Sequence, residues 1–232
     1  VLVLSNAPLP PTTTSILGGP NLSPEQIISY EAGYQGWYLK HRLRLRTDVF
    51  LNHVSDLISV TNQSDTLAIY TNDHGSADIY GAEAGIEWLA TSWLSGFANY
   101  SYQDIRQDSS GRTRRGGPHN KFNLGMRGEW DNGVSAEAVY HYYGSAMYPP
   151  GPSFSTLSQA GLATLPDPFV GSYNRLNMRA AYRFWTQKAA AGYQREAEVA
   201  ATVFNALDDK AKEYPLGQEI GRRIMGWLTL RF

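Results

Sequence analysis

A two-residue alternation of apolar and polar side chains recurs along this chain of 232 residues and constrains its fold more than any other feature. In the last segment Ile224, Gly226, Leu228, Leu230 and Phe232 occupy one parity. The other parity carries Arg223, Met225, Trp227, Thr229 and Arg231. A period of two predicts a β-strand with two unlike faces. In water such a bare edge strand would associate with other chains, whereas a closed membrane barrel leaves no free edge.

The same alternation predicts about eight further strands, which makes the chain all-β. They lie near residues 28–35, 43–52, 80–87, 94–102, 122–130, 134–142, 175–184 and 196–203. One face of these strands is rich in Ala and Tyr, and the other repeatedly carries Arg and Glu. A soluble sandwich would bury its apolar face between two sheets, whereas a membrane barrel turns that face to lipid and its polar face to the lumen. Alternation alone favours the two folds about equally.

The lengths of the connections favour the barrel. Short turns are predicted near 37–41, 89–93, 131–133 and, somewhat longer, 186–195. Long loops are predicted at 55–76, 103–119, 144–172 and 206–219. Outer-membrane barrels have short periplasmic turns and long extracellular loops in this alternating order. We therefore predict an antiparallel transmembrane β-barrel segment.

The tryptophans follow the same arrangement. Five of them adjoin the predicted short turns: Trp37, Trp88, Trp93, Trp130 and Trp185. Amphipathic rings favour the membrane–water interface, so these side chains are predicted to form a belt at one height. Trp227 falls on the polar parity and has no role in this belt.

Composition excludes several other classes of protein. A formal net charge of −1 offers no electrostatic argument for binding nucleic acid, and the absence of Cys excludes disulfides and thiolate metal sites. The chain contains no apolar run of about 18 residues, the length that a membrane helix needs. The start, Val1–Ser5, lacks the pattern of a signal peptide, and an odd strand number does not suit a single-chain barrel. We therefore expect further strands upstream of Val1.

Four short motifs carry a resemblance to a known family. Asn21–Glu25 followed by Ser29–Tyr34 is similar to an "N-L-x-P-E … Y-E-x-G" segment, and Ile79–Glu83 to an "I-Y-G-x-E" strand. Phe204–Lys210 resembles an "N-L-x-D-K" segment, and residues 215–232 resemble a carboxy-terminal box. Together they resemble the TonB-dependent receptors of the bacterial outer membrane.

This resemblance implies a barrel of about 22 strands whose lumen is closed by an amino-terminal plug domain. On this interpretation residues 1–25 form an extracellular loop, and residues 26–232 form the carboxy-terminal part of the barrel. Alternatively, the first four residues are the end of a preceding strand. Such receptors bind scarce nutrients, commonly ferric siderophores, and are energised through a plug segment that contacts the inner-membrane TonB complex. This chain contains neither plug nor TonB box. Leu228, Leu230 and Phe232 are then expected to be the signal for outer-membrane assembly.

Candidate ligand contacts lie in two predicted extracellular loops. Arg112, Arg114 and Arg115 could capture an anionic iron chelate, because guanidinium groups pair well with carboxylates. They could equally be a solvated loop or contact lipopolysaccharide. Tyr148 and Phe154 could close over a ligand, or could pack their loop against its neighbours.

A second set of candidates lies on the polar face. It comprises Arg44, Arg46, Arg127, Arg179 and Arg183, with Glu83, Glu87, Glu129 and Glu137. We expect these residues to hold the plug by salt bridges, although charges that face a wet lumen need no partner. The five His residues are scattered, so no metal site, cofactor or catalytic group is predicted. The alternatives are a soluble or surface β-sandwich and, less favoured, an outer-membrane hydrolase using His141 with a loop Ser.

Overall fold

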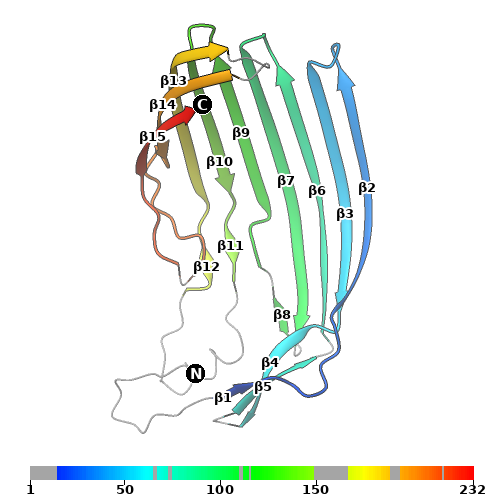
Figure 1. The fold of residues 1–232 in the computed structure, drawn as a ribbon. Helices are drawn as coiled ribbons and strands as arrows, with labels where there is room; N and C mark the ends of the chain where they lie inside the picture. The colour runs from blue at the N-terminus through cyan, green and yellow to red at the C-terminus, as the bar shows by residue number, and fades with distance from the viewer. Residues whose placement is uncertain are drawn as a thin grey trace, which may run out of the picture.

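Nine long strands pair side by side in one antiparallel sheet that curves as part of a barrel wall (Figure 1). The computed structural model describes residues 15–64, 67–72, 75–109, 112–114, 116–148, 167–188, 194–215 and 217–232. The sheet consists of β2 (Gln26–Tyr38), β3 (Leu43–Ser55), β6 (Ser76–Leu89), β7 (Leu94–Ser109), β9 (Asn120–Glu129), β10 (Val134–Tyr143), β13 (Tyr173–Lys188), β14 (Gln194–Phe204) and β15 (Arg223–Arg231). Each strand pairs with its neighbours along the chain, and β2 and β15 lie at the two ends of an open sheet. The prediction of about nine antiparallel strands is confirmed.

The two ends of the sheet differ in the same way as the predicted connections. At the short-turn end, residues 39–42, 90–93, 130–133 and 189–193 join consecutive strands. At the opposite, loop end the described residues form six short strands, one before β2 and five within the longer connections (Figure 1). These are β1 (Ser15–Leu17), β4 (Ile58–Ser64), β5 (Leu67–Asn72), β8 (Arg112–Arg114), β11 (Ala146–Met147) and β12 (Phe169–Val170).

One predicted loop is wrong in its local structure. Within residues 55–76, β4 and β5 form a hairpin, and β1 adds to β5 in parallel to complete a three-stranded sheet. Ser, Thr, Asn and Gln occupy much of this hairpin, so it lacks the amphipathic alternation that marked the long strands. β7 also continues to Ser109, beyond its predicted end near residue 102.

Cross-strand register gives the sheet two unlike faces. One row of paired residues runs through Gly36, Leu45, Ile86, Ala98, Leu124, Tyr140 and Leu176. The neighbouring row runs through Gln35, Arg46, Gly85, Asn99, Asn123, His141 and Arg175. We call these the apolar face and the polar face.

The apolar face has no second layer of protein over it in the described part of the chain. Met126, Val199 and Leu228 are 46%, 48% and 66% exposed. On β6 this face runs from Trp88 to Tyr80, about the nine residues that a tilted strand needs to cross a bilayer core. A β-sandwich would cover these side chains, so that alternative is wrong. Within the same residues, no helix is long and apolar enough to cross a membrane.

Two local features determine how the strands meet. Gly133 adopts a φ of +85°, and a Cβ there would lie 2.5 Å from the carbonyl oxygen of Arg183, so the turn between β9 and β10 requires glycine. On β13, the register with β14 shifts between Arg183 and Trp185, which marks a β-bulge. The bulge pairs Trp185 with Ala197, whose other partner is Leu230, so Trp185 joins the apolar face.

Candidate functional site: the polar face and the loop end

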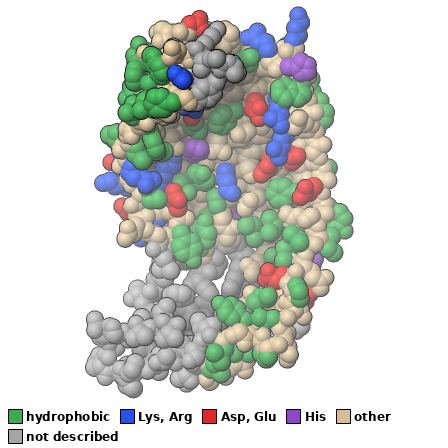
Figure 2. Space-filling view, in the orientation of Figure 1, with side chains coloured by type: hydrophobic (Ala, Val, Ile, Leu, Met, Phe, Trp, Pro, Cys, Tyr) green, Lys and Arg blue, Asp and Glu red, His purple; other side chains and the backbone are tan. Residues whose placement is uncertain are grey.

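The polar face lines the hollow of the curved sheet, where charged side chains of both signs gather (Figure 2). Among the described residues four ion pairs join adjacent strands there, one of them between Glu196 and Arg231. Arg44 lies 3.1 Å from Glu87, and Arg179 lies 2.7 Å from Glu198. Arg183 lies 3.1 Å from Glu196. These pairs arise because register places opposite charges on neighbouring strands of one face.

Arg44 has the most partners at the β2 side of this face. Its Nη1 donates to Glu87, its Nη2 donates to the Gln35 Oε1 atom at 2.9 Å, and its guanidinium lies 5.6 Å from the Trp37 ring centroid. Trp37 therefore faces the hollow and not the surroundings of the barrel. This placement corrects the expectation that Trp37 shares a belt with the other four rings, because register, and not nearness to a turn, decides the face.

The other four tryptophans lie at the short-turn end. Trp93 stacks on Trp130 with ring centroids 5.7 Å apart. The Trp88 ring lies over Gly96, where a Cβ would be 2.4 Å from it. Trp185 reaches the apolar face through its bulge. A membrane-interface belt of these four rings stays a prediction.

Two further ion pairs of the polar face form within single strands. Arg46 lies 2.7 Å from Asp48, and Arg127 lies 2.6 Å from Glu129. Both Arg side chains and that of Glu129 are more than half exposed, so solvent screening keeps the contribution of these pairs to stability small.

Glu196 is the least exposed carboxylate of the polar face, with 11% of its side chain exposed. It pairs with Arg183 of the preceding strand and with Arg231 of the terminal strand. It thereby joins three strands, and it was missed because this requires the β13 bulge and the β15 register together.

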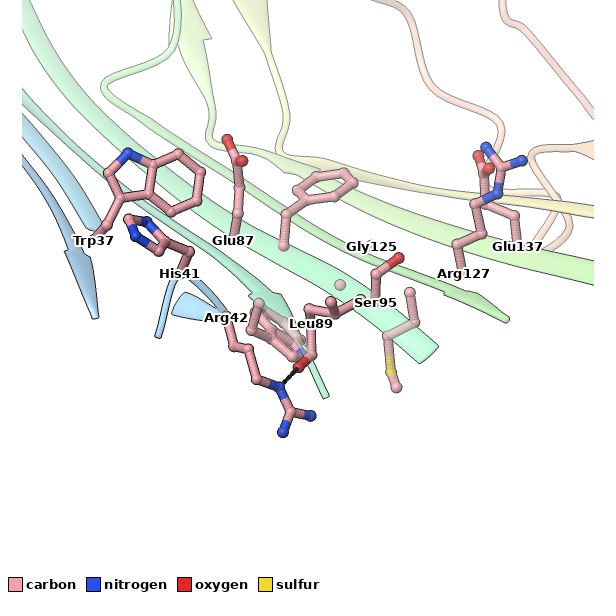
Figure 3. A pocket seen from close by; sticks show the side chains of 13 residues that line it. Trp37, His41, Arg42, Glu87, Leu89, Ser95, Gly125, Arg127 and Glu137 are labelled. Carbon is pink, nitrogen blue, oxygen red and sulfur yellow. Dashed lines mark hydrogen bonds between the residues drawn. The ribbon is translucent and has the colours of Figure 1, made fainter. Parts of the chain in front are cut away.

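A shallow pocket of about 470 Å³ opens on the polar face at the short-turn end (Figure 3). Trp37, Glu87 and Phe97 line it, and the Phe97 ring lies over Gly125, where a Cβ would be only 2.2 Å from the ring. Glu137 also lines it and sits opposite Arg127 in register. That arginine pairs with Glu129 instead, and Glu137 makes no ion pair with any residue that the structure describes. The pocket thus presents aromatic rings beside a carboxylate that forms no ion pair within the described residues.

The predicted ligand contacts are only partly described. Arg112 and Arg114 lie in β8, whose backbone pairs with Ser109 and Gln107 of β7, while Arg115 and Phe154 lie outside the described residues. The Tyr148 ring meets the Tyr214 ring edge-on, with centroids 5.4 Å apart. Tyr148 therefore contacts the last loop, and its role as a ligand contact stays a prediction.

A tyrosine pair lies beside this contact at the loop end, beyond the apolar band. Tyr143 stacks on Tyr173 with centroids 4.9 Å apart. Burial, with a smaller contribution from the charge of Glu213, raises the pKa of Tyr173 to about 12. The Tyr173 hydroxyl therefore stays protonated and is a hydrogen-bond donor at physiological pH.

A charged cluster on the parity of the apolar face begins where the apolar band ends. Asp104, with 7% of its side chain exposed, accepts hydrogen bonds from the Tyr80 hydroxyl at 2.7 Å and from the Arg106 Nε at 3.1 Å. These two hydrogen bonds, of which that from Tyr80 has the larger effect, hold the pKa of Asp104 below its ordinary value. Burial acts in the opposite direction. Next to it His53 lies 2.7 Å from Asp78. The change from Tyr102 to Asp104 at alternate positions could have revealed this boundary in the sequence.

The remaining candidates do not form a metal or hydrolytic site in the described part of the chain. There, no group of three His, Cys, Asp or Glu residues could hold a metal ion. The His141 Nδ1 lies 2.6 Å from the Asn123 Oδ1, so its described partner is an amide and not a serine. Glu83 accepts only a long contact of 3.4 Å from the Ser101 hydroxyl.

Comparisons with known proteins agree with this geometry. The family described as TonB dependent receptor-like, beta-barrel matches residues 4–206. The structure resembles the FrpB iron transporter from Neisseria meningitidis, with a TM-score of 0.68 and 13% identity over 93% of this chain and 32% of that chain. It also resembles the ferric-catecholate import receptor Fiu from E. coli K12, with a TM-score of 0.60 and 17% identity over 89% of this chain and 28% of that chain.

A third similar structure is the pyoverdine outer membrane receptor FpvA from Pseudomonas aeruginosa PAO1, with a TM-score of 0.62 and 17% identity over 89% of this chain and 30% of that chain. The chain thus spans about a third of the length of these structures. No curated protein sequence matches it. Because the family match covers most of the chain and the fold agrees with it, this chain belongs to the TonB-dependent receptor β-barrel family and is a protein of the bacterial outer membrane.

Proposed function

We propose that this chain supplies wall and extracellular loops to a receptor that imports a scarce nutrient, and that this nutrient is a ferric siderophore. The observation that carries the proposal is the two-faced sheet, with bare apolar side chains on one face and ion pairs lining the hollow on the other. The similar structures include an iron transporter, a ferric-catecholate import receptor and a pyoverdine receptor, which supports this choice of ligand. A copper transporter is similar in fold as well, so copper is the competing ligand to test.

The polar face is proposed to receive the plug domain. An occupant of the hollow would meet Glu87 and Phe97, and Glu137, which forms no ion pair within the described residues, would accept a cationic side chain from it. The plug would in turn carry the contact with the inner-membrane TonB complex. Charges on a wet lumen wall need no partner, so this assignment depends on a functional test.

The apolar face indicates what surrounds the barrel. The apolar side chains would contact outer-membrane lipid, and the tryptophans of the short-turn end would lie at its periplasmic interface. The charged cluster around Asp104 would meet the headgroups of lipopolysaccharide. Arg112, Arg114, Arg115, Tyr148 and Phe154 are retained as ligand contacts of the extracellular loops.

Uptake of radioactive iron tests the proposal directly. A strain that lacks the gene is complemented with the complete gene product, and uptake of ⁵⁵Fe is measured with hydroxamate, catecholate and citrate-type siderophores. Uptake of radioactive copper is measured in parallel. We expect uptake of at least one ferric siderophore to depend on the gene and on TonB, whereas gene-dependent copper uptake alone would refute the siderophore assignment.

The arginine loop is tested in the same assay. Replacing Arg112, Arg114 and Arg115 together by Ala should raise the siderophore concentration for half-maximal uptake by about tenfold or more, the effect of losing at least one charge-assisted contact. Arg222→Ala is the matched control, because this exposed arginine lies in a different loop at the same end of the sheet. An equal effect of both changes would remove the special role of residues 112–115.

A further inference from the structure

Arg175 and Asn205 lie almost buried at the loop end, where they face the same two carbonyl groups. The Arg175 side chain is 10% exposed, and Asn205 is 3% exposed. The Arg175 Nη1 donates to the carbonyl oxygens of Asp209 at 3.0 Å and Ile220 at 2.7 Å. The Asn205 Nδ2 donates to the same oxygens at 3.2 and 3.1 Å.

These carbonyls belong to opposite limbs of the last loop, residues 205–222. Further hydrogen bonds close the same neck, because the Asp208 Oδ1 accepts the Arg222 N–H at 2.8 Å and the Ala211 carbonyl accepts the Ile220 N–H at 3.3 Å. The Asp209 Oδ2 accepts the backbone N–H of Asn174 at 2.7 Å and so joins the loop to the start of β13.

The local sequence suits this geometry. Asn205 and Asp208 have φ angles of 51° and 54°, in the left-handed region that Asn and Asp tolerate better than most residues. This accounts for the Phe204–Lys210 motif, which none of the proposed ligand or plug contacts explains. We propose that Arg175, Asn205 and Asp208 form a clasp that closes the neck of the last extracellular loop and holds it as a preformed wall of the receptor mouth.

The electrostatics of Arg175 support a clasp more than a simple ion pair. Its only ionic partner among the described residues is Glu213, which is 3.4 Å away and half exposed. A nearly buried guanidinium needs several acceptors to offset its desolvation, and here backbone carbonyls provide the shortest ones. The face of the guanidinium lies 5.3 Å from the Tyr173 ring centroid, which fixes its orientation.

The clasp also positions residues toward a second loop. Glu213 and Tyr214 lie in the segment between the two clasped carbonyls, and the Tyr214 ring contacts Tyr148 of the 144–172 loop. Closing the neck therefore holds one partner of the contact between the two loops. Arg175 is in this sense a positioning residue, and its effect on uptake rests on the proposed function whereas the clasp itself does not.

Hydrogen exchange on the complete receptor in detergent micelles tests the clasp. In Arg175→Ala, the amides of Asn174, Ile220 and Arg222 should exchange about tenfold faster or more, because the neck loses its charged donor. Arg175→Lys should behave similarly, since a single ammonium lacks the fork that spans both carbonyls and Glu213. Arg179→Ala is the matched control. This arginine lies four residues further along β13 on the same face and pairs with Glu198, so its loss should leave loop exchange unchanged.

Asn205→Gly is the second variant, because glycine keeps the left-handed backbone and removes only the side-chain donor. It should also speed loop exchange, and it decides the matter if the Arg175 variants do not assemble. Wild-type exchange rates in a folded Arg175→Ala or Asn205→Gly receptor would overturn the clasp. In uptake assays both variants should raise the half-saturating ligand concentration with an unchanged maximal rate, whereas absence of uptake by the wild type would count against the proposed function and leave the exchange result intact.

Discussion

Replacing Met126 by Arg is the sharpest test of which face meets lipid. Met126 is 46% exposed on the apolar face of β9, midway between Phe122 and Trp130 at the ends of the apolar band. Four residues on either side of it, at about 3.4 Å each and a tilt of about 45°, put it about 10 Å below both interfaces. It therefore lies close to the centre of the hydrocarbon layer.

The depth of an arginine in the membrane determines how strongly it destabilises the folded barrel. On the lipid face of a membrane barrel it destabilises folding by about 2–4 kcal/mol at the midplane and by about 0–1 kcal/mol near the interfaces. The Met126→Arg change should thus lower the folding equilibrium constant by about 30- to 1000-fold. The neighbouring Arg127 provides the control, because its exposed pair with Glu129 contributes less than about 1 kcal/mol.

Guanidinium unfolding of the complete receptor in phospholipid vesicles, followed by tryptophan fluorescence, measures both effects. We expect a clear loss of unfolding free energy for Met126→Arg and little change for Arg127→Met. Equal losses, or a larger loss for Arg127→Met, would show that the assignment of faces is inverted. That result would remove the membrane interpretation together with the proposed function.

Three further expectations come from the same geometry. Glu196→Gln should destabilise the receptor by about 1–3 kcal/mol in the same unfolding assay, because two arginines lose a partly buried counterion. The control Glu129→Gln should destabilise it by less than about 1 kcal/mol, because Glu129 is exposed. Equal effects of the two changes would contradict the role of burial. Phe232→Ser should lower the surface level of the receptor in outer-membrane fractions, and unchanged levels would refute its role in assembly. Tyr80→Phe should lower the free energy of unfolding at pH 7, because Asp104 loses a hydrogen-bond donor. Because the folded-state pKa of Asp104 is depressed, this stabilisation exists above its ordinary value of 3.8 and should fade as pH falls below it; a loss independent of pH would oppose this account.

The strands and their faces were readable from the sequence because their periodicity is a local property of the backbone. A side chain two residues along a strand points to the same side, so alternation such as that of Ile224, Leu228 and Leu230 predicts the face without any knowledge of the partner strand. The alternating short and long connections followed from the same segmentation. The hairpin of β4 and β5 was missed since its polar side chains carry no such pattern.

The pairing of charges was less predictable. Arg44 and Arg179 were expected on the polar face, but their partners Glu87 and Glu198 depend on the register between strands. Neither Glu196 nor the motif at Asn205 could be given a structural role from the sequence. Their partners lie on strands and loop limbs that come together only when the sheet has formed.

Local sequence therefore determined that this chain builds a two-faced wall and which residues each face carries. Tertiary structure decided where that rule is broken or refined: a one-residue bulge turns Trp185 outward, register places Trp37 over Arg44, and Arg175 joins two limbs of a loop. The physical reason is one of range. Periodicity acts between adjacent residues, whereas register, bulges and buried donors are settled by hydrogen bonds between segments far apart in the chain.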